Sequence, residues 1–304
     1  MLTRCRRFAT KIVTEWYCRK TMLIGDAAHV FPPFGGQGIA TGIRDAQGLS
    51  WRLAMMSKMN LPSKVQQKIL LGWSQERRHG WQASMRATKL NGSIVNDRAW
   101  LRGILYRITM RVLWWFPAIA RFRTRQAFKD KLIFNQTTCP DGFFSEKAGG
   151  GQKVAQVWVR RAGEAPRLSD SAFIRDLSRL SLLILVRNPS DIDSAKVAEV
   201  LQASGLPEDL ISMDEVTFFD ISGSVKDLDA NAKLGGEIYR PCPAEELVKE
   251  GIKPIQCYSP AYIQNRLHKS VKFVLLRPDF FVHSVASDFD GLSRNLQEVR
   301  DYFR

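Results

Sequence analysis

Residues 23–53, "LIGDAAHVFPPFGGQGIATGIRDAQGLSWRL", decide how the first part of this chain is expected to fold. The short apolar run "KTMLIGD" predicts a strand that ends at Gly25 and Asp26, and the Pro/Gly-rich "HVFPPFGGQG" predicts a loop. From Thr41 to Met56, apolar residues recur at spacings of three and four, which is typical of one helical face. That expected face consists of Ile43, Ala46, Leu49, Leu53 and Met56. The stretch therefore predicts a strand, a glycine-rich loop and a helix.

This order of elements suits a large anionic ligand that carries a polyol chain. A carboxylate directly after a strand can accept hydrogen bonds from sugar-like hydroxyls, which makes Asp26 a candidate ligand-binding residue. Glycines let a backbone approach a planar ring or a phosphate, and N–H groups at a helix start favour anionic oxygen. The glycines of this stretch are Gly35, Gly36, Gly38 and Gly42, and Pro32 and Pro33 stiffen the approach to them. For "GGQG" alone, a plain strand-to-helix turn is an equally good interpretation.

Two further helices are expected in the first part of the chain. One covers Ser63 to about Thr88, and an arginine-rich segment covers roughly Arg98 to Lys131 with a break at Pro117. The apolar side of the former contains Val65, Ile69, Leu70 and Trp73. A stretch of Pro, Gly and polar residues, "TTCPDGFFSEKAGGGQK", predicts a linker. We therefore divide the chain into residues 1–150 and 151–304.

The second part has the pattern of a small α/β domain. Strands are predicted at "VAQVWV" (154–159), "LSLLILV" (180–186), "VTFFDI" (216–221) and in a hairpin within "SVKFVLLRPDFFVHSVA" (270–286). The second of these is apolar enough to be a central strand that is buried on both faces. Helices are expected within 189–205, with Ser190 or Asp191 near the N-cap, and over 288–303. These elements give the domain a β-α-β start and a β-β-α finish.

The positive charge is concentrated in one part of the chain. The net charge is +15, with about +18 in residues 1–135 and −3 in the remainder. A basic part joined to a nearly neutral part suggests two units with different partners. Trp114, Trp115 and neighbouring arginines could form a surface for a membrane or a nucleic acid, but a core stripe flanked by solvated arginines is the commoner arrangement.

Composition and cysteine usage favour a cytoplasmic protein without a metal site. The five cysteines include no C-x-x-C pair and no zinc-like His cluster, which fits a reducing setting. The first twenty residues are basic but contain no apolar core of a secretory signal. The longest apolar stretch, 104–120, is interrupted by Arg107 and Arg111, so we expect no membrane span. We expect no nucleic-acid partner either.

The motif "GDAAHVFPPFGGQGIATGIRDAQGLSWRL" resembles the second flavin-binding motif of the group A FAD-dependent aromatic monooxygenases, the phenol hydroxylase and 3-(3-hydroxyphenyl)propionate hydroxylase type. The similarity extends upstream through "RFATKIVTEWYCRKTML" and downstream to "WSQERR". In the second part, "GGGQKVAQVWV", "RLSD" and "LLRPDFFV" resemble the thioredoxin-like domain appended to these enzymes. The implied fold is α/β: a partial FAD-binding domain of the Rossmann-like, p-hydroxybenzoate hydroxylase type, mostly helical here, followed by a thioredoxin-like domain.

The resemblance implies a cofactor, a reaction and a set of binding residues. Asp26 would bind the ribityl chain of FAD, and the loop and helix start would line its ring system. The expected FAD-binding residues are Gly25, Asp26, Pro33, Gly35, Gly36, Gln37, Gly38, Ile39 and Ala40. The implied chemistry is reduction of FAD by NAD(P)H, followed by oxygen transfer from O2 to a phenolic or polyketide-like aromatic substrate. No catalytic residue is assigned, and His29 is expected to shape the loop rather than act as a base.

One expected motif is missing from these 304 residues. The family begins with a β-α-β unit whose G-x-G-x-x-G loop holds the FAD pyrophosphate, and the sequence contains no such motif. We therefore expect a C-terminal portion of a longer enzyme, with FAD affinity too weak to retain the cofactor through purification. Two positions also differ from the commonest family form, which has an Asn in place of Ala40 and another in place of Gly48.

Two alternative functions stay open at this point. The chain could be a catalytically inactive remnant whose thioredoxin-like domain mediates association, including as a homodimer. It could also be a basic protein that binds a polyanion, which a steep salt dependence of binding would reveal. The thioredoxin-like part is not expected to exchange disulfides, because Cys242 and Cys257 are too far apart in sequence to form a C-x-x-C motif.

Overall fold

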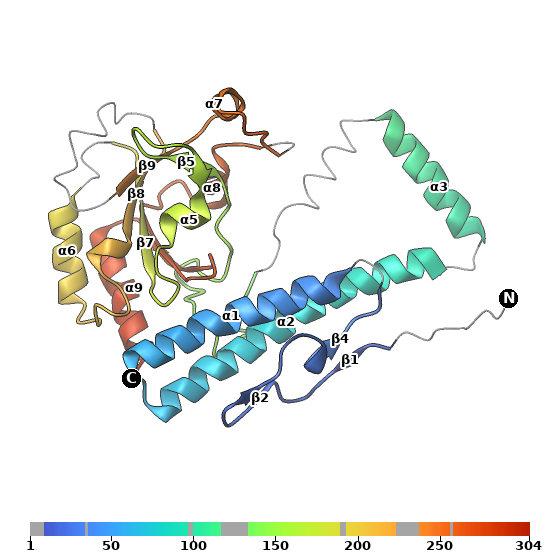
Figure 1. Cartoon of the computed structure of the whole chain (residues 1–304), viewed down its shortest axis with the longest axis horizontal. Helices are drawn as coiled ribbons and strands as arrows, with labels where there is room; N and C mark the ends of the chain where they lie inside the picture. Colours follow the sequence, from blue (N-terminus) through green and yellow to red (C-terminus); the bar gives the residue numbers. More distant parts are fainter. Residues whose placement is uncertain are drawn as a thin grey trace. The chain divides into compact units, whose positions relative to one another are not determined.

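The computed structural model describes residues 9–33, 36–96, 100–116, 133–188, 193–222, 237–255 and 258–304 (Figure 1). The chain forms two compact units. The first consists of Met1–Leu49 and Gly72–Leu132, and the second of Ser50–Leu71 and Ile133–Arg304. Two long helices, α1 (Gln37–Met59) and α2 (Ser63–Asn96), each pass from one unit to the other.

The first unit combines short antiparallel strand pairs with long helices, as the sequence predicts. The pairs are β1 (Lys11–Ile12) with β4 (His29–Val30), and β2 (Tyr17–Cys18) with β3 (Thr21–Met22). A single 3-10 turn, η1 (Gly25–Ala27), lies between β3 and β4. The expected strand in "KTMLIGD" is thus only two residues long. The third helix, α3, covers Trp100–Trp115, while Pro117 and the rest of the expected arginine-rich segment lie outside the described residues.

The buried face of α1 agrees only in part with the one that its apolar pattern predicts: Leu49 and Met56 are buried, but the other three residues are exposed. Ile43 is 64% exposed, Leu53 is 38% exposed and Ala46 is also exposed. Within the first unit, the buried residues of this helix instead include the polar Thr41 and Asp45. The apolar pattern fails here because a carboxylate can be buried when cationic and N–H donors reach it, and such donors come from distant parts of the chain. The apolar face predicted for α2 is correct, since Val65, Ile69, Leu70 and Trp73 are all buried.

The second unit is built on a seven-stranded mixed sheet in the order β11-β10-β7-β8-β9-β5-β6. Strands β7, β8 and β9 are parallel to one another, and the outer strands are antiparallel to their neighbours. The strands are β5 (Trp158–Arg160), β6 (Arg167–Leu168), β7 (Ser181–Val186), β8 (Val216–Asp220), β9 (Glu237–Pro241), β10 (Phe273–Leu276) and β11 (Val282–Ala286). The helices are α5 (Ser169–Phe173), α6 (Ser194–Ala203), α7 (Ala244–Lys249), α8 (Tyr262–Arg266) and α9 (Phe289–Tyr302).

The predicted order of elements in this unit is confirmed. The β-α-β start is β7-α6-β8, and the β-β-α finish is β10-β11-α9. Asp193 caps α6, its Oδ1 accepting a hydrogen bond from the Lys196 backbone N at 3.0 Å, whereas Ser190 and Asp191 lie outside the described residues. The strand expected over 154–159 begins only at Trp158, because Val154 N and Val157 N donate to Phe280 O and the Ser169 hydroxyl rather than to a neighbouring strand.

Alternation along the strands fills a separate core on each face of the sheet. Leu182 and Ile184 of β7 belong to one cluster, which includes residues of α1, α6 and α9, and Leu183 and Leu185 belong to the other, which includes α5 and α8. All six residues of β7 are buried, which confirms the prediction of a central strand covered on both sides.

A glycine-rich loop closes the outer edge of β11. Ser145 N donates to His283 O, Val285 N donates to Ala148 O, and Gly151 N donates to Val282 O. A Cβ on Gly150 would lie 2.0 Å from His283 O, so only glycine lets the loop come this close. Residues 133–150 are therefore part of the second unit, which begins earlier than the division at residue 150 proposes. Among the described residues, no helix is long and apolar enough to cross a membrane.

Candidate functional site

The Gly25–Asp26 turn is fixed against α1 by close backbone packing and by one hydrogen bond. Gly25 adopts a φ of +58°, a conformation that favours glycine. A Cβ on Gly42 would lie 3.3 Å from Gly25 Cα, so these two glycines permit the turn to touch the helix. Gly25 N also donates to Asp45 Oδ2 at 3.1 Å. Gly42, predicted to face a ligand, packs against this turn instead.

Asp26, the next residue, is presented to the surface. Its side chain is exposed and makes no hydrogen bond or ion pair with any part of the chain that the structure describes. An exposed carboxylate on a rigid turn is suited to accept hydrogen bonds from hydroxyl groups of a ligand. The ribityl-binding role that the resemblance implies for Asp26 stays a prediction.

The start of α1 supplies the second part of the predicted site. The helix begins at Gln37, so its first turn contains Gln37, Gly38, Ile39 and Ala40. This end of the helix carries the partial positive charge of the macrodipole, and the first turn contains no acidic residue to neutralise it. A Cβ on Gly36 or Gly38 would meet nothing within 4 Å. The backbone is therefore open to a planar or anionic ligand.

The remaining predicted residues lie beside this helix start. Pro33 is exposed, and its carbonyl accepts a hydrogen bond from Gly36 N at 3.4 Å. Gly35 lies outside the described residues. Ile39 is 82% exposed and Ile43 is 64% exposed, so an apolar surface adjoins the open glycines. These open glycines and the exposed carboxylate of Asp26 fit a flavin with a ribityl chain.

Behind the turn lies a buried polar cluster that sequence analysis missed. Asp45 Oδ2 accepts from His29 Nε2 at 2.6 Å, and its Oδ1 accepts from Arg77 Nε at 2.7 Å. Burial raises the pKa of Asp45, but the hydrogen bonds from His29 and Arg77 and the charge of Arg77 outweigh it, so the net pKa is lowered. The carboxylate is therefore ionised, and His29 Nε2 is the donor in their hydrogen bond.

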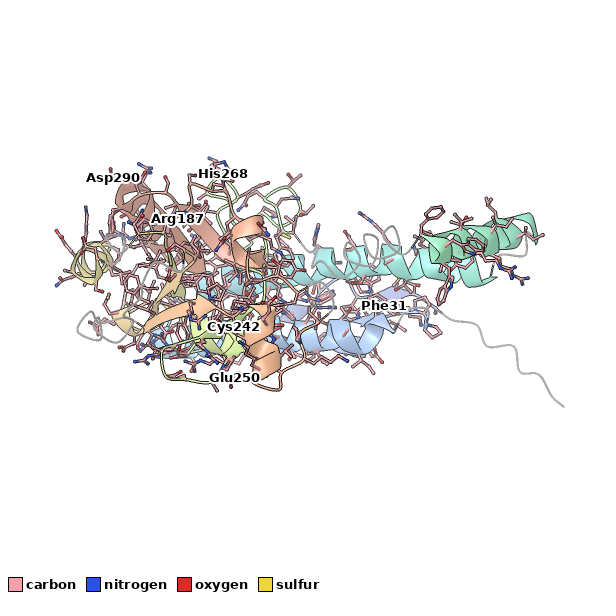
Figure 2. The ribbon with its side chains drawn as sticks, turned by 90° about the horizontal axis from the view of Figure 1, so that it is seen from above. Phe31, Arg187, Cys242, Glu250, His268 and Asp290 are labelled. Carbon is pink, nitrogen blue, oxygen red and sulfur yellow. The ribbon has the colours of Figure 1, made fainter. Side chains whose placement is uncertain are left out.

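Aromatic side chains surround this cluster. The Trp16 ring lies 5.3 Å from that of His29, and Phe31, labelled in Figure 2, lies 5.4 Å from it. Trp73 Nε1 donates to the Asp45 backbone O at 3.2 Å. The sequence offered two weak signals for the cluster: His29 lies within the glycine-rich motif, and Arg77 lies within the downstream "WSQERR" stretch. The position of His29 agrees with its predicted role in shaping the loop.

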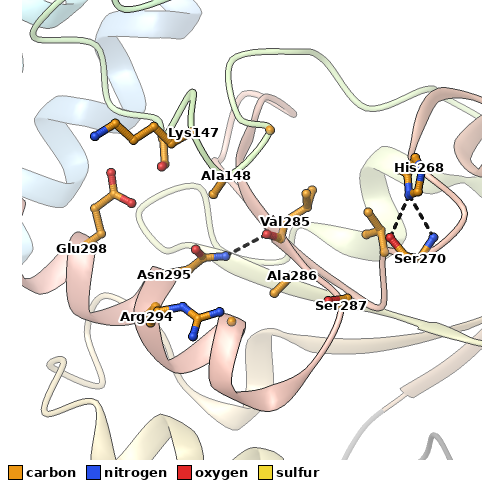
Figure 3. Close-up of a pocket in the computed structure, with 14 residues that line it drawn as sticks. Lys147, Ala148, His268, Ser270, Val285, Ala286, Ser287, Arg294, Asn295 and Glu298 are labelled. Carbon is orange, nitrogen blue, oxygen red and sulfur yellow. Dashed lines mark hydrogen bonds between the residues drawn. The ribbon is translucent and has the colours of Figure 1, made fainter.

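The second unit contains a separate groove of about 550 Å³, which opens between the loop near Ser145 and the first turns of α9 (Figure 3). Asn295 lines it and is held by its Nδ2, which donates to Val285 O at 3.0 Å. The charged groups of Lys147, Arg294 and Glu298 lie on long exposed side chains. None of the sequence-predicted site residues lines this groove.

The second unit buries two thiols, those of Cys139 and Cys242, and the environment of Cys242 disfavours its thiolate form. Cys242, labelled in Figure 2, is fully buried, and burial raises its pKa. A raised pKa lowers the thiolate fraction and with it the nucleophilicity. Cys257 lies outside the described residues, so the absence of disulfide exchange in this unit stays a prediction.

Comparison with known proteins first defines the class. Residues 4–88 match the FAD binding domain family. The OxyS anhydrotetracycline hydroxylase from Streptomyces rimosus has a similar fold, with a TM-score of 0.54 and 17% identity, covering 95% of this chain and 46% of that one. Residues 4–88 are thus similar to part of an FAD binding domain, in a fold of mixed α and β content.

Two relatives then narrow the class. The 3-(3-hydroxy-phenyl)propionate/3-hydroxycinnamic acid hydroxylase of Comamonas testosteroni is 24% identical over 95% of this chain and 52% of its own length. A probable NADH-specific resorcinol 4-hydroxylase of Rhodococcus jostii is 51% identical over 49 residues, which are 16% of this chain and 9% of that protein. These similarities to named aromatic hydroxylases support the resemblance to the group A FAD-dependent aromatic monooxygenases that the motif indicates, and the chain spans about half the length of the Comamonas relative.

Proposed function

We propose that this chain forms the flavin-facing portion of an FAD-dependent monooxygenase that hydroxylates an aromatic substrate. The observation that carries the proposal is the exposed Asp26 carboxylate beside the open first turn of α1, within the segment that matches the FAD binding domain family. Bound FAD would supply the redox chemistry, in which NAD(P)H is the reductant and O2 is the source of the transferred oxygen atom.

Each predicted binding residue that the structure describes has a role in this proposal. Asp26 accepts hydrogen bonds from the ribityl hydroxyls. Gly36 and Gly38 admit the ring system because their Cα atoms have open space beside them. The helix start that contains Gln37, Ile39 and Ala40 favours negative charge on the ring by roughly 0.3 to 2 kcal/mol. Gly25 shapes the turn that presents Asp26, and Pro33 shapes the chain just before the start of α1.

The substrate class and the electron donor are drawn from the relatives. The Comamonas relative is named for phenolic acids and the Rhodococcus relative for resorcinol, so we propose a phenolic substrate for the enzyme to which this chain contributes. The Rhodococcus protein is also named as NADH-specific, which supports a nicotinamide donor. The missing G-x-G-x-x-G unit would have to come from additional polypeptide. A cytoplasmic setting, a homodimer and a thioredoxin-like second unit stay predictions.

A flavin titration of the purified 304-residue protein tests this proposal. We expect FAD to bind weakly and to be lost during purification. When FAD is added back, we expect its fluorescence to be quenched as it binds. Asp26→Asn should weaken FAD binding about tenfold, because it removes a charged hydrogen-bond acceptor. Asp301→Asn, which changes an exposed carboxylate of the second unit, is the matched control and should leave affinity unchanged. Equal affinity in both variants, or no binding at saturating FAD, would contradict the proposal.

A further inference from the structure

The Asp45 carboxylate joins three separate parts of the first unit. It accepts hydrogen bonds from Gly25 N in η1, from His29 Nε2 at the start of β4, and from Arg77 Nε in α2. The side chain of Asp45 has no solvent exposure, and its own backbone O accepts from Trp73 Nε1. A fully buried carboxylate with three donors holds these segments in one arrangement.

We infer that Asp45 is a positioning residue for flavin binding: through the Gly25 N–H it fixes the turn that presents Asp26 to the ribityl chain. This inference rests on the proposed function, because it assigns a second residue to the same site. Asp45 itself does not reach the surface and would not touch the ligand.

The turn needs such a restraint because glycine is conformationally permissive. Gly25 has a φ of +58°, and glycine populates positive and negative φ with similar ease. Its single N–H is bonded to Asp45, and its Cα lies against Gly42, one helical turn earlier on α1. The helix thus holds Gly25 at two points, and the direction in which the Asp26 side chain leaves the turn follows from them.

The other two donors make Asp45 a suitable anchor. Arg77 and His29 keep the carboxylate ionised, and an ionised acceptor forms a shorter and stronger hydrogen bond with a backbone N–H. Trp16 and Trp73 are almost completely buried beside it, which keeps water from competing for the same oxygen atoms. A neutral or mobile side chain at this position would leave Gly25 free to change conformation.

The test compares two flavins that differ in the group Asp26 would bind. Riboflavin carries the ribityl chain, and lumiflavin carries a methyl group in its place. Asp45→Asn offers one acceptor oxygen to three donors and should weaken riboflavin binding about tenfold, with less than about twofold change for lumiflavin. When Asp45→Asn is combined with Asp26→Asn, it should cause little further loss of riboflavin affinity, because both changes remove the contact between Asp26 and the ribityl chain.

Two further variants separate positioning from general damage. Trp73→Phe removes the hydrogen bond to the Asp45 backbone O from an equally buried site and leaves the carboxylate intact, so it should keep the wild-type ratio of riboflavin to lumiflavin affinity. Gly42→Ala favours the helix but brings a Cβ within 3.3 Å of Gly25 Cα, so it should lower riboflavin affinity while the protein stays folded.

Hydrogen exchange at the Gly25 amide gives a measurement that needs no flavin. We expect protection in the wild type and in Trp73→Phe, and at least about tenfold faster exchange in Asp45→Asn. If riboflavin binds but Asp45→Asn behaves like Trp73→Phe, the inference is overturned and the proposed function stands. If the wild type binds neither flavin, the proposed function fails for this chain. The exchange result then decides alone: unchanged protection in Asp45→Asn overturns the restraint on Gly25, and lost protection supports it.

Discussion

Each unit buries one histidine, one aspartate and one arginine close together, but the two clusters hold these groups differently. The clusters are His29, Asp45 and Arg77 in the first unit and Arg277, Asp279 and His283 in the second. In the first unit, both the histidine and the arginine donate to the aspartate. In the second, the arginine donates to the aspartate, and the histidine lies beside the positive charge of that arginine.

The second cluster closes the β10–β11 hairpin. Arg277 Nε and Nη2 donate to the two oxygens of Asp279 at 3.0 and 2.6 Å, and Trp51 Nε1 donates to Asp279 at 3.1 Å. Burial and the positive charge of Arg277 lower the pKa of His283 to about 3. This imidazole is therefore neutral, and its Nδ1 lies 3.1 Å from the Ser284 hydroxyl.

This difference in bonding indicates a different role for each cluster. The second cluster lies within the packed sheet and its hairpin, where it joins the hairpin to Trp51. The first lies behind a surface turn that exposes the Asp26 carboxylate, which has no hydrogen-bond partner among the described residues, and exposed apolar residues lie nearby. The same three residue types thus stabilise a core in one unit and, as we propose, support a binding site in the other.

The largest expected effect on the free energy of unfolding comes from replacing the arginine of each cluster. Arg277→Met removes the two-fold hydrogen-bond partner of the buried Asp279 and leaves it the Trp51 donor and the nearby positive charge of Arg52, so it should lower the free energy of unfolding by about 3 to 5 kcal/mol. Arg77→Met leaves Asp45 two donors, His29 and Gly25, so about 1 to 3 kcal/mol is expected. Urea unfolding measures both. Lys58→Met, which breaks the exposed pair with Asp176, is the control and should cost less than about 1 kcal/mol. Equal losses for the two arginines would remove the contrast between the clusters.

Replacing one glycine by alanine in each region should give a somewhat smaller difference in stability between the two regions. Gly150→Ala places a Cβ 2.0 Å from His283 O and should destabilise the second unit by about 3 kcal/mol. Gly38→Ala meets nothing within 4 Å and should change stability by less than about 0.5 kcal/mol, but it should weaken flavin binding. Thermal melting and flavin titration of both variants check this pair. A stable Gly150→Ala protein would show that the loop need not close on β11.

The smallest effect concerns pH. The pKa of His283 is about 3 in the folded chain and about 6.5 when unfolded, so below pH 6.5 the unfolded state binds a proton that the folded state does not. Stability is therefore lost as pH falls from about 6.5 toward 3, by about 2 kcal/mol between pH 7 and 5. Urea unfolding at both pH values measures this, and His283→Asn should lose that contribution. His268, which is exposed and bonded to Ser270, provides His268→Asn as the control. An identical pH dependence in both variants would disprove the assignment.

The sequence alone predicted the elements whose signals are local. Periodic apolar residues predicted the positions of α1, α2 and α9, a continuous apolar run predicted β7, and turn residues predicted the β10–β11 hairpin. The order of Gly25, Asp26 and the following glycine-rich segment predicted a turn that precedes a helix start. These features depend on neighbours a few residues apart, and a single sequence displays such neighbours directly.

Tertiary structure alone decided which polar groups are buried and what they bind. The sequence pattern placed Ile43 and Leu53 on the buried face of α1, whereas Asp45 is buried because Arg77 and His29 reach it from 32 and 16 residues away. Trp51 and Asp279 are 228 residues apart, and Gly150 is needed only because His283 O lies against it. A buried charge is stable only with its partners in place, and those partners are brought together by the folded chain rather than by the local sequence.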